Sequence, residues 1–110
     1  MQTKISKTIK ELPEDERPRE KLLKYGADRL SDAELLAILL RTGTKGKSAI
    51  EMAEEILKNA GGTFKGLAGK DIDEITKTPG IKNAKVITIA AALEISRRVS
   101  KQILKDKGII

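Results

Sequence analysis

The chain is 110 residues long, which fits a single domain with a modest hydrophobic core. It contains no cysteine and no histidine, so disulfides, zinc sites built on these residues, and catalysis by a serine–histidine or cysteine–histidine pair are excluded. No apolar run is long enough to span a bilayer, and the first residues lack the apolar stretch of a signal peptide. We therefore expect a cytoplasmic protein that does not contact membranes.

The basic side chains are distributed unevenly along the chain. The formal net charge is +6, and residues 77–107 alone hold eight basic and two acidic side chains, a difference of six. Arg41, Lys45 and Lys47 form a second basic cluster without an acidic residue. A local excess of this kind favours a polyanionic partner, whereas a basic surface that only keeps the protein in solution explains the charge equally well.

The first 17 residues are polar and carry mixed charges, so residues 1–17 are predicted to form an arm outside the folded domain. Pro18 suits the first position of a short helix that continues over residues 19–25, because proline lacks the N–H that this position leaves unbonded. Gly26 is expected to end that helix. The helical domain is accordingly predicted to begin at residue 18.

Three further helices are marked at their starts by one pattern, in which Ser or Asp is followed three residues later by Glu. This pattern is the capping box, whose two side chains bond backbone N–H groups that a helix start leaves unpaired. It predicts helices over residues 32–40, 49–60 and 72–77, opened by the pairs Ser31/Glu34, Ser48/Glu51 and Asp71/Glu74. A longer, last helix is predicted from residue 83 or 84 to about residue 100 or slightly beyond.

Apolar residues recur at intervals of three and four along these segments, as expected for helices with one buried face. In the last helix Val86, Ile89, Ala90, Leu93 and Val99 repeat this spacing, which predicts that they lie on the buried face. Glycine-bearing turns join the second predicted helix to the third and the fourth to the last, which suggests two similar hairpins in tandem. The predicted fold class is all-α, a compact bundle of about five helices.

Residues 78–83, with the sequence Thr-Pro-Gly-Ile-Lys-Asn, carry the strongest functional signal. A Pro-Gly corner breaks one helix, an isoleucine is placed to plug the core beneath the turn, and a small alanine starts the next helix. Such a turn directs backbone N–H groups and the positive end of a helix dipole outward, where a phosphate oxygen is the natural ligand. The alternative is a corner that only joins two packed helices. The predicted nucleic-acid contacts here are Lys77, Gly80, Ile81, Lys82, Asn83, Ala84 and Lys85.

The turn before Ser48 is a second candidate phosphate contact, because it also leads into a helix start. Its predicted contacts are Arg41, Gly43, Lys45, Gly46 and Lys47. The turn looks a little like the end of a nucleotide-binding P-loop, but the leading strand and the glycine spacing of that motif are missing. The acidic residues 71, 73 and 74 are better explained by a helix start than by a metal site. We predict no catalytic residue and no metal site.

Several stretches resemble the N-terminal part of the RadC-like proteins. They are residues 15–27, residues 30–43, the hairpin with Gly80-Ile81 and Ala84-Lys85, and the segment with Ala91-Ala92-Leu93-Glu94 and Arg97-Arg98. The resemblance spans about residues 12–98 and implies helix-hairpin-helix units of the SAM-like or RuvA domain 2-like type, which bind DNA backbone. It also implies that carbonyl groups of the Gly80–Ala84 hairpin hold a monovalent cation, and no other cofactor is expected. This chain has Lys82 where a second glycine is usual, so a positive φ there would strain the backbone.

In the RadC-like family this part normally precedes a domain that looks like a zinc-dependent JAB/MPN metallopeptidase. This chain has no histidine and ends at Ile110, so we predict a non-catalytic N-terminal fragment, with a helical domain over residues 18–104 and the start of a linker over residues 105–110. The family label of DNA repair does not establish repair activity. The expected function is binding of duplex or branched DNA without sequence readout. The alternative is a protein-interaction or scaffolding domain that positions the missing metallopeptidase-like domain of the same protein.

Overall fold

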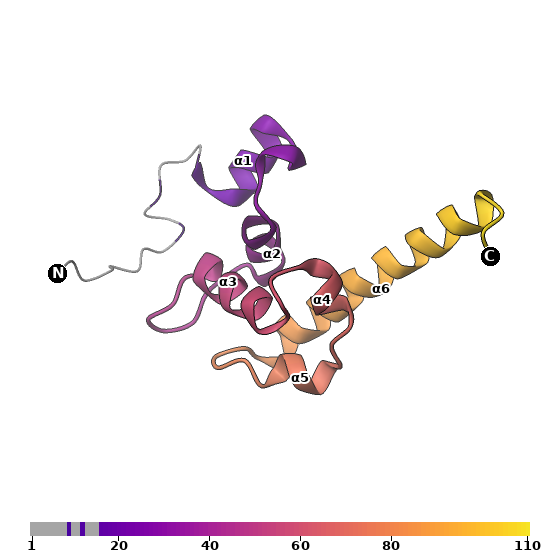
Figure 1. Cartoon of the computed structure of the whole chain (residues 1–110). Coiled ribbons are helices and arrows are strands. Elements are labelled where there is room, and N and C mark those ends of the chain that lie inside the picture. Colours follow the sequence, from indigo (N-terminus) through magenta and orange to yellow (C-terminus); the bar gives the residue numbers. More distant parts are fainter. Residues whose placement is uncertain (1–8, 10–11, 13–15) are drawn as a thin grey trace.

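The computed structural model describes residue 9, residue 12 and residues 16–110, and every regular element among them is helical. In chain order these are α1 (Pro18–Tyr25), the short 3-10 helix η3 (Ala27–Arg29), α2 (Asp32–Leu40), α3 (Ala49–Asn59), α4 (Phe64–Ala68), α5 (Ile72–Thr76) and α6 (Asn83–Asp106) (Figure 1). The prediction of an all-α fold is confirmed. Most of the predicted arm, residues 1–17, lies outside the described residues.

The predicted helix starts are confirmed, and local side chains account for those of α2, α3 and α5. The Ser31 hydroxyl accepts a hydrogen bond from the Glu34 N–H at 3.2 Å, while the Glu34 carboxylate accepts one from the Ser31 N–H at 2.9 Å. The same reciprocal pair joins Ser48 and Glu51, at 3.1 and 3.2 Å. A third capping box opens α5 at Asp71. These bonds fix where α2, α3 and α5 begin, because they satisfy backbone donors that would otherwise be unpaired.

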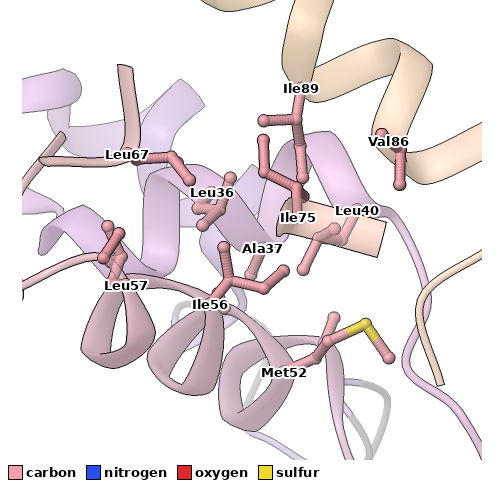
Figure 2. Close-up of a cluster of buried hydrophobic side chains, with 13 residues drawn as sticks. Leu36, Ala37, Leu40, Met52, Ile56, Leu57, Leu67, Ile75, Val86 and Ile89 are labelled. Atoms are coloured by element: carbon pink, nitrogen blue, oxygen red, sulfur yellow. The ribbon is translucent and has the colours of Figure 1, made fainter. Parts of the chain in front are cut away.

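The core is aliphatic and lies where α2, α3 and α6 meet, with α4 and α5 closing its side (Figure 2). Helix α2 packs mainly on α3 and also on α6. Met52 is fully buried, and Leu36 and Ile89 are each 1% exposed. The labelled core side chains come from five helices and point toward one another, and they are Leu36, Ala37, Leu40, Met52, Ile56, Leu57, Leu67, Ile75, Val86 and Ile89. This core therefore holds α2, α3 and α6 in fixed positions relative to one another.

Helix α6 is longer than predicted and only its first part is packed. It runs for 24 residues to Asp106, and its second half projects from the bundle (Figure 1). The prediction that Val99 faces the core is wrong, since this side chain lies on the projecting half. Exposed apolar side chains on this half are Ile95, Val99 and Ile103, at 64%, 54% and 47%. No helix in the described part of the chain is both long and apolar enough to cross a membrane.

Helix α4 lies in the glycine-bearing segment 61–69, for which the sequence predicts a connection and no helix. Thr63 opens it by accepting a hydrogen bond from the Gly66 N–H at 3.0 Å. Leu67 from this helix is 2% exposed and joins the core. A helix of five residues with one buried side chain is too short to show a helical repeat in its sequence.

Candidate nucleic-acid interface

The turn between α5 and α6 is a tight β-turn over residues 78–81. The carbonyl of Thr78 accepts a hydrogen bond from the Ile81 N–H at 3.2 Å, and Pro79 and Gly80 occupy the two central positions. Gly80 has a φ of +83°, which a type II turn requires at this position and which residues with a side chain rarely adopt. Ile81 is half-buried and packs against the core, as predicted. The turn is therefore anchored from below.

Lys82 precedes α6 with extended backbone angles, φ −105° and ψ 161°. The strain considered for it does not occur, because the positive φ of this turn falls on Gly80. No side chain in the described residues caps the start of α6, unlike the starts of α2 and α3. Asn83 and Ala84 are exposed, and their N–H groups have no acceptor within the helix. The positive end of a 24-residue helix thus faces solvent beside a lysine.

The turn between α2 and α3 is also a hairpin, the first of the two in chain order. Thr44 and Lys47 exchange two backbone hydrogen bonds, at 2.9 and 3.0 Å, which place Lys45 and Gly46 at the tip. A Cβ atom on Gly43 would lie 2.0 Å from the carbonyl oxygen of Lys47, so only glycine lets the two arms approach this closely. Lys45 is consequently held exposed at the end of a compact turn.

Backbone strain occurs at Arg41, the residue that follows α2. Its φ of 69° is the only positive value at a non-glycine residue in the described part of the chain, and its ψ is −50°. The Thr42 N–H donates to the Leu40 carbonyl at 2.8 Å, which closes a three-residue γ-turn around Arg41. This form of the γ-turn is rare and strained for a residue with a side chain. The strain lies in the first hairpin, at a residue that no sequence pattern marks as strained.

The two hairpins lie against each other. An ideal Cβ position on Gly80 is 2.7 Å from Cγ2 of Thr44, so the turns touch where Gly80 has only a hydrogen. The Lys85 ammonium group of α6 donates to the carbonyl oxygens of Leu40 and Thr42, each at 2.6 Å, and to the Thr42 hydroxyl at 3.0 Å. Two predicted contact regions that are distant in sequence thereby form one surface. We call this surface the hairpin face and define it as residues 41–47 and 77–85.

The predicted contact residues differ in how accessible they are. Exposed residues are Arg41, Lys45, Gly46, Lys77, Gly80, Lys82, Asn83 and Ala84, and partly buried ones are Gly43, Lys47, Ile81 and Lys85. Lys47 forms an ion pair with Glu55 of α3. The four exposed cations of the face form no ion pair with any described residue. The positive charge of the hairpin face is therefore largely uncompensated.

Cations gather most closely where the hairpins meet. The pKa of Lys85 is lowered by its partial burial and then by the positive charges of Arg41 and Lys82. Arg97 and Arg98 on the far half of α6 differ, because they share the carboxylate of Glu94 at 2.9 and 2.8 Å. The mutual repulsion of Arg41, Lys82 and Lys85 favours binding of an anionic ligand at the start of α6.

The described residues contain no group of three or more acidic side chains that could hold a metal ion. Asp71 and Glu74 form the capping box at the start of α5, in which the Glu74 carboxylate accepts a hydrogen bond from the Asp71 N–H at 3.2 Å. The pKa of Glu74 is lowered by this backbone hydrogen bond and then by Lys70.

Sequence reasoning missed two residues of the hairpin face, Thr42 and Thr44. Each of them links the hairpins, Thr42 through its oxygens to Lys85 and Thr44 through its methyl group to Gly80. Neither link has a local sequence signal, because the partners are 36 to 43 positions apart.

The hairpin face lies within a domain shared by a known family. Residues 9–87 match the family model described as UPF0758 N-terminal, which is well over half of the chain. The chain belongs to the UPF0758 family. RadC is a name of this family, so the resemblance to RadC-like proteins is confirmed, and the matched region is the UPF0758 N-terminal domain.

The UPF0758 relatives are longer than this chain. A UPF0758 protein of Syntrophomonas wolfei is 45% identical over 95 residues, which are 86% of this chain and 40% of that protein. One of Nitrosomonas eutropha is 47% identical over 102 residues, or 93% of this chain and 45% of the relative. One of Trichlorobacter lovleyi is 50% identical over 92 residues, with 82% and 40% covered. The chain thus spans about two fifths of the length of the curated relatives it matches. No solved structure matches it.

Proposed function

We propose that this UPF0758 domain binds the backbone of duplex or branched DNA through its hairpin face and does not read base sequence. The proposal is carried by one observation, the contact between the two hairpins. That contact brings the two turns and their exposed cations together, and Arg41 and Lys82 lie near enough to Lys85, at the uncapped start of α6, to lower its pKa. The other exposed cations of the two turns are Lys45 and Lys77.

The chemistry of the face favours phosphate over bases. Exposed N–H groups at a helix start and nearby lysines are suited to phosphate oxygens, and such contacts carry no sequence information. Residues 41–47 and 77–85 contain no aromatic side chain on which an unpaired base could stack. Backbone contact is therefore favoured over single-strand stacking.

A monovalent cation at the hairpin is part of this proposal. The Gly80 and Ile81 carbonyl groups accept no backbone hydrogen bond from the described residues, so they fit the oxygen donors that such a cation needs. When bound, the cation would add positive charge between the turn and a phosphate. Gly80 positions one of these carbonyls through its positive φ.

The test is a salt titration of DNA binding with two matched variants, Lys82→Met and Lys101→Met. Both remove one positive charge at an exposed position, but Lys82 precedes α6 whereas Lys101 lies on its projecting half, about 28 Å farther along the helix. Fluorescence anisotropy with a labelled DNA duplex gives the slope of log affinity against log salt. For Lys82→Met the magnitude of this slope should fall by about 0.9, and for Lys101→Met it should not change. Equal slopes for both variants and the unaltered protein would reject the hairpin face as the binding site.

A second candidate function is suggested by the projecting half of α6. Its exposed Ile95, Val99 and Ile103 form an apolar surface on a helix that extends away from the bundle, and such surfaces mark protein contacts. In this alternative the domain is a scaffold that binds the remaining part of a full-length UPF0758 protein, which we expect to be metallopeptidase-like. The two functions are separated by measuring binding of that remaining part to the unaltered domain and to Val99→Asp, each with and without DNA. If Val99→Asp loses binding of that part and still binds DNA, the scaffold function is supported.

A further inference from the structure

We infer that Lys85 is a positioning residue, whose ammonium group fastens the start of α6 to the end of α2 and does not bind phosphate itself. This inference rests on the proposed DNA-backbone binding by the hairpin face. It gives Lys85 a different task from the phosphate contact that the sequence predicts, and it leaves that contact to exposed cations such as Lys82.

The hydrogen bonds of Lys85 use its whole donor capacity. A lysine ammonium group has three N–H donors and no acceptor. Here the three acceptors are the Leu40 carbonyl at 2.6 Å, the Thr42 carbonyl at 2.6 Å and the Thr42 hydroxyl at 3.0 Å. A phosphate oxygen could be bound only by giving up one of these bonds. Lys82, in contrast, is exposed and has no ion-pair partner among the described residues.

The position of the ammonium group suits the end of α2. Carbonyl groups at a helix end carry partial negative charge, and a cation there is favourable. The last turn of α2 has no basic residue of its own. Lys85 supplies that cation from α6, at a distance of 45 residues in sequence from Leu40. The hydrogen bond from Lys85 to Leu40 therefore stabilises the end of α2 and also joins the two hairpins.

The same group supports the strained residue of the first hairpin. Leu40 and Thr42 flank Arg41, and Lys85 bonds a carbonyl on each side of it. A strained backbone conformation persists only where neighbouring contacts hold it. Lys85 thus fixes the direction in which the Arg41 side chain leaves the hairpin face, together with the contact between Gly80 and Thr44.

The first test measures the ammonium protons of individual lysines by NMR in the unaltered protein. A lysine bonded to three protein acceptors exchanges its protons with water slowly. We expect the Lys85 protons to exchange several-fold more slowly than those of exposed Lys101, both with and without DNA. Lys82 protons should be slowed only when a DNA duplex is added. Fast exchange of Lys85 in the free protein, slowed only by DNA, would overturn the inference.

The second test compares Lys85→Met with Lys82→Met in the full chain. Lys85→Met should weaken DNA binding several-fold while changing the salt slope by less than half as much as Lys82→Met does, and it should shift the backbone amide resonances of Thr42 and Thr44. An equal fall of the slope in both variants would identify Lys85 as a phosphate ligand.

The two proposals fail in different ways. If the unaltered protein binds no DNA in dilute buffer, the proposed function is rejected, and the exchange rate of Lys85 still decides whether it holds the hairpins together. The exchange measurement needs no variant, so it tests the role of Lys85 even where Lys85→Met does not fold.

Discussion

The contact between the two hairpins can be tested by adding a single methyl group at Gly80. At a φ near +80° an alanine is destabilised by about 1–2 kcal/mol relative to glycine, because its Cβ crowds the backbone. Gly46 has a φ of +80° with nothing within 4 Å of an added Cβ, so Gly46→Ala should show this backbone effect alone. At Gly80 the φ is +83° and the added Cβ would lie 2.7 Å from Cγ2 and 3.3 Å from Cβ of Thr44.

Because real Cβ atoms essentially never show contacts as short as 2.7 Å, the Thr44 side chain or the turn must shift, and Gly80→Ala adds an overpacking penalty of about 1–3 kcal/mol. The free energy of unfolding should therefore fall by about 2–5 kcal/mol for Gly80→Ala and by about 1–2 kcal/mol for Gly46→Ala. The reduced freedom of alanine in the unfolded chain affects both variants alike and cancels in the comparison.

Urea unfolding followed by far-ultraviolet circular dichroism is the suitable assay. The chain has no tryptophan, and its single tyrosine, Tyr25, is 46% exposed and not part of the core, so the helix signal is the better probe. Thr44→Ser removes the methyl group that the alanine would meet. In a double-mutant cycle it should recover most of the additional loss in Gly80→Ala. Equal losses at Gly80 and Gly46, or a coupling energy near zero, would refute the contact between the hairpins.

Two further predictions concern charged residues. Arg41→Gly should raise the free energy of unfolding by about 1 kcal/mol, because glycine adopts the positive φ without strain. The same variant should reduce the salt slope of DNA binding by about 0.9, because it removes one positive charge. Urea unfolding measures the first effect and fluorescence anisotropy the second, and a variant less stable than the unaltered protein would contradict the strain at Arg41. The pKa of Glu94 is lowered from 4.5 to about 2 by hydrogen bonds from Arg97 and Arg98. Since this pKa is lower in the folded state, the stabilisation is present above pH 4.5 and is lost as the pH falls toward 2. Carbon-detected NMR titration of Glu94 should give the low value, and Glu94→Gln should abolish this part of the acid sensitivity of α6.

The helix starts could be predicted because their causes are local. Ser48 and Glu51 are three positions apart, and their two hydrogen bonds need no other part of the molecule. The end of α6 lies beyond the predicted residue 100, although Ile103 continues the apolar spacing past Val99. A helix exposed on most sides does not need that repeat, and the stop signal is Gly108, which has a φ of 74° just after the helix.

The candidate site was predicted only in part. The Pro79-Gly80 corner and the exposed Lys82 follow from a short segment, so sequence reasoning located them. The bonds from Lys85 to Leu40 and Thr42 depend on how α2 and α6 pack, and packing brings together residues 43 and 45 positions apart. No local pattern distinguishes a lysine that turns inward to a helix end from one that faces solvent.

The length of α6 has a mechanical consequence. Its 24 residues form a rod of about 35 Å, with the hairpin at one end and free helix at the other. Rotation of the domain about the hairpin by about 10° would swing the far tip through about 6 Å, given that rod length. Small differences in the angle at which the hairpin face contacts a binding surface therefore cause large displacements of the C-terminal end of α6.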